Sequence, residues 1–268
     1  MLDLCLNTKL PILSESRYIN PWIGQSVQYF DSLPSTQELA IELAKKREVP
    51  EGTIIRTGHQ TAGRGQANND WQDAGYSNIA LSIILYPTSY LRASQSFQLS
   101  KWAAVSVYHA LREWLPGSFQ IKWPNDLWHD ERKLSGILIH TSMTGTELQY
   151  AVIGIGINVN QDDFGSLSQA TSVHRITGKV HDLDQIMTKL IQELNFWFET
   201  LTSSDHRQLD LEYLKHLLGF QQQRLFRISG GEIFRASVLG VEENGSLILR
   251  DAQKTRRFGF KEIEWLTQ

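Results

Sequence analysis

The feature that most constrains the fold of this chain is a change of pattern near Gly219. Beyond it, short apolar segments alternate with turn residues, and one of these turns is Asn244-Gly245. Both residues tolerate the positive φ of a tight hairpin turn, so this pair predicts a β-hairpin. The short segments are residues 224–228, 232–241, 246–250 and 255–260. Their length and spacing predict a small β-barrel at residues 220–268, appended to a larger α+β domain at residues 1–219.

The larger part of the chain contains longer segments of both kinds. Apolar runs predict strands at residues 27–30, 52–56, 78–86, 119–123, 134–140 and 149–157. Helical spacing predicts helices after residue 35 and at residues 94–114, 182–201 and 205–218. Ser35 and Glu38 fit a capping box, in which the serine caps the backbone and the glutamate reaches back. Residues 58–69 predict a glycine-rich polar loop, and residues 1–25 predict a loosely organised leader.

Composition excludes several classes of protein. The net charge is −3, from 26 basic and 29 acidic residues, which argues against a general nucleic-acid binder. The single cysteine, Cys5, cannot form an intramolecular disulfide, so the cytosol is the default compartment. We find no signal-peptide pattern and no apolar stretch of membrane-spanning length. The sequence therefore predicts a soluble cytoplasmic protein that does not associate with membranes.

The first segment that could carry chemistry is Gly-Arg-Gly at residues 63–65, followed by Trp71. The glycines allow the backbone to approach a ligand, and the guanidinium of Arg64 suits a carboxylate or a phosphate. Taken alone, the segment fits a surface loop with a solvated arginine equally well, because short glycine-rich matches are common.

The second segment reads Lys-Trp-Pro-Asn-Asp at residues 122–126 and Lys-Leu-Ser-Gly-Ile-Leu at residues 133–138. It gathers two lysines, an amide and a carboxylate around a strand–loop–strand unit. A lysine charge can meet the negative charge that develops on a phosphate. The alternative is a structural hairpin with exposed lysines, but the mutual spacing of these residues is hard to match by chance.

The third segment reads Gly-Ile-Gly-Ile-Asn at residues 154–158. Glycines inside a strand often mark the close approach of a ligand or of another backbone, although a buried strand with packing glycines fits as well. The segment is not a dinucleotide fingerprint, because Val159 stands where a third glycine is required. The eight histidines include no pair at a spacing such as His-Glu-x-x-His, so the sequence predicts no zinc site.

Taken in order, these segments resemble the biotin–protein ligases. The family pattern is a Ser-Thr pair that opens a helix, Gly-Arg-Gly with a following tryptophan, Lys-Trp-Pro-Asn-Asp, Lys-x-x-Gly-Ile-Leu and Gly-x-Gly-Ile-Asn. The resemblance extends from about Val27 to the C-terminus. It implies a catalytic domain related to class II aminoacyl-tRNA synthetases, with a mixed sheet flanked by helices and an SH3-like C-terminal barrel.

The resemblance also implies an activity and a site. The enzyme would form biotinyl-5′-AMP from biotin and ATP, with Mg²⁺, and transfer biotin to a lysine of a biotin carboxyl carrier protein. The implied biotin-binding residues are Ser35, Thr36, Gln60, Gly63, Arg64, Lys133 and Gly136, with Lys133 and Arg64 as the catalytic residues. The implied ATP-binding residues are Gly65, Trp71, Lys122, Asn125 and Asn158. Asp126 would be a partner of Mg²⁺ or of Lys122.

This chain departs from the family pattern in two places. The family often has further arginines after Gly-Arg-Gly, whereas residues 66–70 here read Gln-Ala-Asn-Asn-Asp. The loop is therefore expected to hold the adenylate less tightly. From its glycine content, the segment of residues 58–69 is expected to be mobile without ligand and ordered with biotinyl-adenylate. Gln37 stands where the family often has asparagine. Residues 1–25 are too few for the helix-turn-helix repressor domain of some members, so we expect no DNA binding.

Two other functions remain open from the sequence. A lipoate or octanoate ligase would activate a different acid on the same plan, but Ser35, Thr36 and Gln60 better suit the polar ureido ring of biotin. A non-catalytic biotin-binding module is the alternative from another class, and the presence of both Lys122 and Lys133 argues against it. The sequence does not distinguish a monomer from a homodimer.

Overall fold

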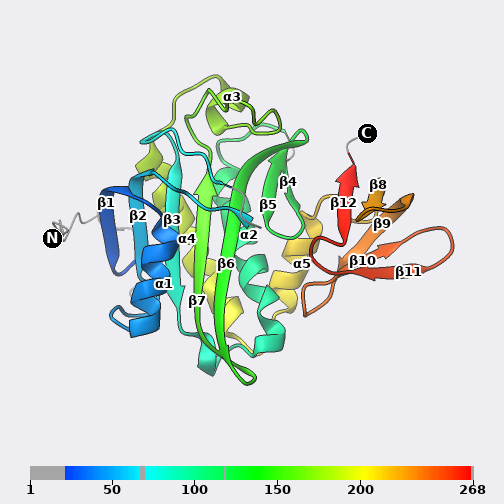
Figure 1. The fold of residues 1–268 in the computed structure, drawn as a ribbon, viewed down its shortest axis with the longest axis horizontal. Coiled ribbons are helices and arrows are strands. Elements are labelled where there is room, and N and C mark those ends of the chain that lie inside the picture. Colours follow the sequence, from blue (N-terminus) through cyan, green and yellow to red (C-terminus); the bar gives the residue numbers. More distant parts are fainter. Residues whose placement is uncertain (1–21, 67–69, 118, 267–268) are drawn as a thin grey trace.

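The computed structural model describes residues 22–66, 70–117 and 119–266. Two β-sheets organise this part of the chain (Figure 1). The larger sheet has seven strands in the order β1-β2-β3-β7-β6-β5-β4. Its strands are β1 (Val27–Leu33), β2 (Ile54–Gln60), β3 (Ile79–Leu85), β4 (Phe119–Lys122), β5 (Asp126–His129), β6 (Arg132–Thr144) and β7 (Glu147–Ile157). It is mixed, because β1 pairs with β2 in parallel and the other neighbours are antiparallel.

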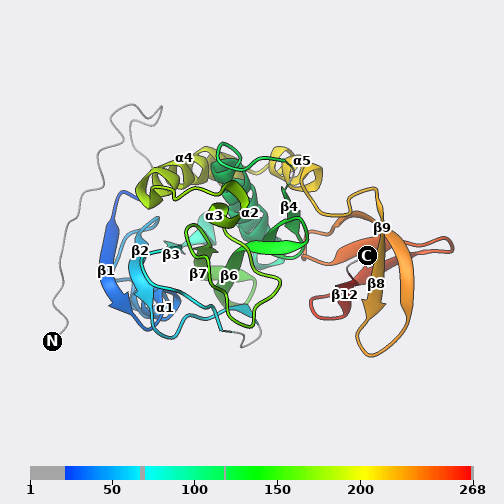
Figure 2. The same ribbon diagram turned by 90° about the horizontal axis from the view of Figure 1, so that it is seen from above.

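Helices cover both faces of the larger sheet. The helices are α1 (Thr36–Lys46), α2 (Phe97–Leu111), α3 (Val173–Thr177), α4 (Leu183–Thr202) and α5 (Arg207–Lys215). Figure 2 shows α1 on one face of the sheet and α2, α4 and α5 on the other. Ala40 and Ala44 are the small buried residues of α1, and they let this helix pack closely against Ile84 and Val152 of the sheet. α2 is apolar on most sides because it lies between the sheet and α4, where Trp102 donates to the carbonyl of Leu194 at 3.0 Å.

The smaller sheet follows α5 and is antiparallel throughout. Its strands are β8 (Gln223–Ile228), β9 (Ile233–Val241), β10 (Leu247–Arg250), β11 (Thr255–Phe258) and β12 (Ile263–Leu266), in the order β11-β10-β9-β8-β12. Gly245 has a φ of +88° in the turn between β9 and β10, as the Asn-Gly pair predicted. The expected mixed sheet with helices and the expected all-strand C-terminal unit are thus both present. β5, α3 and β12 were not predicted.

Two predicted boundaries were wrong. The glycine-rich loop was expected from residue 58, but β2 continues to Gln60 because β1 offers it a parallel partner, with Leu33 opposite Gln60. The leader was expected to reach residue 25, but Ile23 is fully buried, and its backbone N–H and carbonyl are both hydrogen-bonded to the Asn195 amide at 2.9 Å. Residues 1–21 of the leader and residues 67–69 of the loop lie outside the described residues.

Within the described part of the chain, each helix is too short or too polar to cross a membrane.

Candidate active site

A cavity opens on the α1 side of the larger sheet, at the N-terminal end of that helix. Its walls come from α1, from β2 and the segment after it, and from β3, β5, β6 and β7. The lining residues are Ser35, Thr36, Gln37, Gln60, Arg64, Gly65, Gln66, Trp71, Leu81, Ser82, Asn125, Asp126, Lys133, Gly136, Ile137, Leu138, Gly154, Ile155 and Gly156. Most of the predicted site residues therefore meet in one place. Gly63, Lys122 and Asn158 are not among the lining residues.

A chain of hydrogen bonds fixes the polar wall of the cavity. Gln60 Oε1 accepts from the Thr36 backbone N–H at 2.9 Å and from its hydroxyl at 3.2 Å. The Thr36 hydroxyl also lies 2.9 Å from that of Ser82, which donates to Gln37 Oε1 at 3.1 Å. Gln37 Nε2 donates to the Val152 carbonyl at 3.1 Å, so every amide in the chain has a set orientation. Such preorganised groups suit the recognition of a polar ligand.

Ser35 does not form the predicted capping box. It occupies the N-cap position of α1 with extended backbone, but its side chain makes no capping hydrogen bond. Its hydroxyl is buried and has no partner among the described residues, and it lines the cavity. A buried hydroxyl without a partner costs on the order of 1–3 kcal/mol, so this group suits a ligand that supplies a hydrogen bond.

Glu38, the other half of the predicted capping box, pairs with Arg64 instead. The Arg64 Nε lies 2.7 Å from a carboxylate oxygen of Glu38, and both side chains are about half exposed. An exposed pair of this kind contributes little free energy, so a ligand phosphate can compete for the guanidinium. The pair holds Arg64 beside the first turn of α1, at the wall of the cavity.

Lys133 and Asp126 form an ion pair at the cavity. The lysine Nζ lies 2.8 Å from a carboxylate oxygen of Asp126, so the aspartate pairs with this lysine rather than with Lys122. The side chain of Lys133 crosses Gly136, where a Cβ would come within 3.1 Å of Nζ. Gly136 stands opposite Asp126 across β5 and β6, and its lack of a side chain leaves room for the pair.

Trp71 lies against the glycines of the central strands. Gly136 and Gly156 face each other across β6 and β7, and a Cβ on Gly156 would come within 2.5 Å of the Trp71 indole. Gly63 holds the same tryptophan from the other side. The Gly63 carbonyl accepts a hydrogen bond from the backbone N–H of Trp71 at 2.9 Å, and a Cβ on Gly63 would come within 2.6 Å of the Trp71 carbonyl oxygen. Gly63 therefore positions Trp71 and does not itself line the cavity.

Asn125 and Asn158 both support the strand that carries Lys133. Asn125 lines the cavity, and its amide donates to the Ile137 carbonyl of β6. The buried Asn158 amide donates to the Thr171 carbonyl at 3.0 Å, and the Thr171 N–H donates to the Lys133 carbonyl at 2.9 Å. Asn158 thus acts on the site through the backbone of Lys133.

Lys122 lies outside the cavity, next to the C-terminal sheet. Its Nζ is 3.5 Å from the centroid of the Trp128 ring, and it lines a second cavity with Arg224 and Trp265. The pKa of Lys122 is lowered to about 8, mainly by burial and also by the charge of Lys133, while Asp126 and Glu264 oppose the shift. Lys122 is nevertheless the direct neighbour of Asp126 across β4 and β5.

Comparison with known proteins assigns this architecture to a family. Residues 29–158 match the model of the Biotin/lipoate A/B protein ligase family. The bifunctional ligase/repressor BirA of Bacillus subtilis is 30% identical to the chain over 246 residues, which are 90% of this chain and 74% of that protein. The chain belongs to the biotin–protein ligase family. This confirms the resemblance inferred from the order of the motifs.

Further relatives of this ligase family agree in sequence and in fold. The biotin–[acetyl-CoA-carboxylase] ligase of Paracoccus denitrificans is 29% identical over 227 residues, covering 81% of this chain and 90% of that protein. The solved structure of the Aquifex aeolicus biotin protein ligase, in complex with biotin and ATP, superimposes with a TM-score of 0.75. It covers 91% of this chain and 100% of that one at 24% identity, which supports the common fold.

The cavity of this ligase family member also contains residues that were not among the predicted biotin-binding or ATP-binding residues. Gln37, Ser82 and Gly154 form part of the wall, and a Cβ on Gly154 would meet Gln37 Oε1 at 2.5 Å. In the sequence, Gln37 is notable only because it stands where the family often has asparagine. Ser82 had a usable signal, because it is the single polar residue in the otherwise apolar strand β3.

Proposed function

We propose that this chain is an ATP-dependent biotin–protein ligase. It forms biotinyl-5′-AMP from biotin and ATP and then transfers the biotinyl group to a lysine of a biotin carboxyl carrier domain. The observation that carries the proposal is the content of one cavity. The same walls present the oriented amide of Gln60, the Lys133 ammonium and the buried Ser35 hydroxyl, for which the described residues supply no hydrogen-bond partner.

The polar wall favours biotin over lipoate or octanoate. The ureido ring of biotin both donates and accepts hydrogen bonds, which suits a free hydroxyl and fixed amides. An alkyl chain in the same place would leave the Ser35 hydroxyl buried and unpaired, at a cost of roughly 1–3 kcal/mol. The names of two relatives, both biotin–[acetyl-CoA-carboxylase] ligases, point to biotin as well.

The first chemical step suits the charges in the cavity. The biotin carboxylate attacks the α-phosphorus of ATP, a carboxylate–phosphorus bond forms, and pyrophosphate leaves. Such transfers depend mainly on positioning and on neutralising spread negative charge. Lys133 would reach both the carboxylate and the α-phosphate, and Arg64 would leave Glu38 to stabilise the adenylate. Trp71 would offer its indole to the nucleotide.

In the second step, the amine of the carrier lysine attacks the acyl carbon of the adenylate. The amide bond forms, the bond to the phosphate breaks, and AMP leaves with the charge that Lys133 and Arg64 can neutralise. A module that only binds biotin needs at most one cationic side chain, to pair with the biotin carboxylate. The two cationic side chains at this site, Lys133 and Arg64, can also neutralise the charge of an acyl phosphate.

Asp126 fits the requirements of a Mg²⁺ ion. This ion binds in nucleotide sites through one or two carboxylates and substrate phosphates, and Asp126 is a carboxylate that lines the cavity. Bound there, Mg²⁺ would neutralise phosphate charge on ATP. Lys122, the cross-strand neighbour of Asp126, would approach the ATP phosphates from the side of the C-terminal sheet.

The finer architecture belongs to the same proposal. Residues 1–219 would form the class II aminoacyl-tRNA synthetase-like catalytic domain, and residues 220–268 an SH3-like domain. The strands β8 to β12 form an antiparallel sheet of their own, separate from the seven-stranded sheet, and this supports the division.

The test is ATP–pyrophosphate exchange with Mg²⁺, in which biotin, lipoate and octanoate are compared. Exchange with biotin, followed by a mass increase of one biotinyl group on a carrier domain, is the expected result. Exchange with lipoate or octanoate alone would assign a different acid. Tight biotin binding without exchange would show a binding module. In the same assay, Lys133→Ala should lose exchange. Lys45→Ala, at an exposed lysine on α1, is the control variant.

A further inference from the structure

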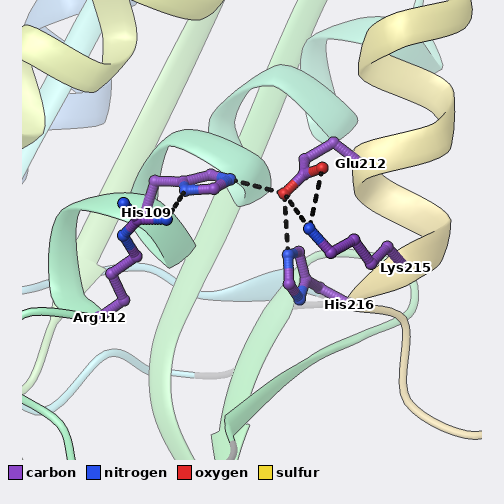
Figure 3. Close-up of polar contacts among 5 residues, drawn as sticks. All are labelled: His109, Arg112, Glu212, Lys215 and His216. Atoms are coloured by element: carbon purple, nitrogen blue, oxygen red, sulfur yellow. Dashed lines mark hydrogen bonds and ion pairs between the residues drawn. The ribbon is translucent and has the colours of Figure 1, made fainter.

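Three metal-ligating side chains converge on the face of the molecule opposite the candidate active site, between α2 and α5. His109 comes from the end of α2, Glu212 from α5, and His216 from the residue that follows α5. The Nε2 atoms of both histidines lie 2.9 Å from the same oxygen, Oε1 of Glu212 (Figure 3). All three ligand atoms lie within 4.8 Å of one another. Among the described residues, no other trio of His, Cys, Asp or Glu side chains meets these criteria.

The neighbours of the trio fix its geometry. The side chains of His109, Glu212 and His216 are only 12%, 18% and 15% exposed. The His216 ring stacks on Tyr108 at a centroid distance of 3.8 Å, and the His109 ring lies 5.5 Å from that of Trp197. Rings held by packing keep their ligand atoms aimed at a common point, which is what a preorganised metal site requires.

The protonation of the trio also suits a metal. Burial favours the neutral form of both imidazoles and lowers their pKa, against the opposing influence of Glu212. Burial acts to raise the pKa of Glu212, but the hydrogen bond from His216 and the charge of Lys215 outweigh this effect, and the pKa is lowered. Two neutral imidazoles and one carboxylate are the forms of these side chains that bind metals.

The ligand set identifies the kind of ion. Two imidazole nitrogens with one carboxylate oxygen are a common Zn²⁺ set, whereas Ca²⁺ and Mg²⁺ prefer oxygen ligands only. With Zn–ligand bonds of about 2.0–2.2 Å, tetrahedral ligands stand roughly 3.3 Å apart. The two observed separations of 2.9 Å need only a small expansion to admit the ion.

Two cationic side chains compete with a metal at this place. Lys215 Nζ lies 3.4 Å and 3.5 Å from the two Glu212 oxygens, and Arg112 lies 3.3 Å from Nδ1 of His109. A metal on Nε2 moves the proton of His109 to Nδ1, so Arg112 must turn away. Both cations are long, exposed side chains and can do so, at a cost in metal affinity.

We propose that His109, Glu212 and His216 form a binding site for Zn²⁺, with water as the fourth ligand. The ion would tie the end of α5 to α2 at the point where the chain leaves for the C-terminal sheet. The backbone already connects this point to the larger sheet, because Ile121 of β4 exchanges hydrogen bonds of 2.8 Å with His216 and Leu218. The metal would therefore brace the base of the C-terminal sheet.

The test is titration of the untagged, metal-free full chain with ZnCl₂ by calorimetry near pH 7.5. The proposal expects one saturable site per chain. It also expects a rise in Tm of about 5 °C or more when free Zn²⁺ is about 100 times Kd. Glu212→Gln and His216→Gln should weaken binding at least about tenfold. His140→Gln, an exposed histidine on β6, is the matched control and should bind like the wild type.

Two further measurements keep the test independent of any loss of folding. Co²⁺ in the wild type should give the intense visible absorption of a four-coordinate site. Lys215→Ala should bind Zn²⁺ about two- to fivefold more tightly, because the competing charge is gone. No saturable binding to the wild type, equal affinity in folded Glu212→Gln, or weaker binding in Lys215→Ala would overturn the proposal.

Discussion

The Lys133 ammonium lies 2.8 Å from a carboxylate oxygen of Asp126, and the lysine side chain crosses Gly136 to reach it. The lysine is therefore held at the cavity before any ligand binds, by a carboxylate on the neighbouring strand β5. The same carboxylate faces Gly136 across the sheet, so the pair and the glycine form one unit. An ammonium that is already positioned before the ligand binds can stabilise the negative charge that develops on the phosphate.

Replacement of this lysine tests its role directly. Lys133→Ala should lower biotin-dependent ATP–pyrophosphate exchange by about 10²–10³-fold, the usual effect of removing one charge-stabilising group. Its Tm should stay within a few degrees of the wild type, because the ion pair is partly exposed and contributes little to folding. Lys45→Ala should retain full exchange. Wild-type exchange in a folded Lys133→Ala protein would contradict the assignment.

A second prediction separates the two possible tasks of Asp126. If Asp126 meets Mg²⁺, Asp126→Asn should raise the Mg²⁺ concentration for half-maximal exchange by about tenfold, since a carboxylate binds this ion far better than an amide. The measurement is exchange over a Mg²⁺ series at saturating ATP and biotin. Asp184→Asn, at a half-exposed aspartate on α4, is the control. An unchanged Mg²⁺ requirement with a lower maximal rate would show that Asp126 serves only to orient Lys133.

A third prediction concerns the contact between Trp71 and the glycines of the sheet. Gly156→Ala would place a methyl group about where the indole now lies, at 2.5 Å from its nearest atom. The indole must move, so the KM for ATP should rise about tenfold or more, and overpacking should cost about 1–3 kcal/mol of stability. The control is Gly231→Ala, where a Cβ would meet nothing closer than 3.8 Å. A KM for ATP equal to that of the wild type would remove Trp71 from the nucleotide site.

The sequence predicted which residues gather at the candidate site better than it predicted the contacts among them. The motifs identified Ser35, Arg64 and Lys133 by type and order, and these residues do meet in the cavity. Spacing along the chain could not show that Arg64 would take Glu38 away from the capping box, because that pairing joins residues 26 positions apart through tertiary structure. A sequence motif such as the capping box predicts hydrogen bonds between residues that are close in the chain. A partner that the fold brings nearby can replace them.

The same limit explains the other surprises. The side chain of Lys122 lines a cavity together with Arg224 and Trp265 of the C-terminal sheet, and no motif in the sequence records that proximity. His109 lies 103 positions from Glu212, so the trio could not appear in a search for short metal-binding motifs. The parallel pairing of β1 with β2 is equally invisible in the alternation of apolar residues, because register depends on both strands.

The last prediction uses the lowered pKa of Lys122. The main cause of this shift is the burial of the lysine, whose ammonium lies over the Trp128 ring. The folded protein releases this proton near pH 8, whereas the unfolded chain holds it until about pH 10.5. Between these values the unfolded state binds more protons, so this group makes the protein more stable as pH rises. Below about pH 8, Lys122 is charged in both the folded and the unfolded protein, so burial of the charge lowers the stability of the folded protein by its full amount.

Lys122→Met removes this titration. Its advantage in free energy of unfolding over the wild type should be largest below pH 8 and should fall by up to about 3 kcal/mol as pH approaches 10.5. Urea unfolding of both proteins at pH 7.5, 8.5 and 9.5 measures the difference, and Lys45→Met, an exposed lysine, should show no such trend. A difference that stays constant over this range would mean that Lys122 keeps an ordinary pKa, and that its ammonium is solvated rather than buried against the indole.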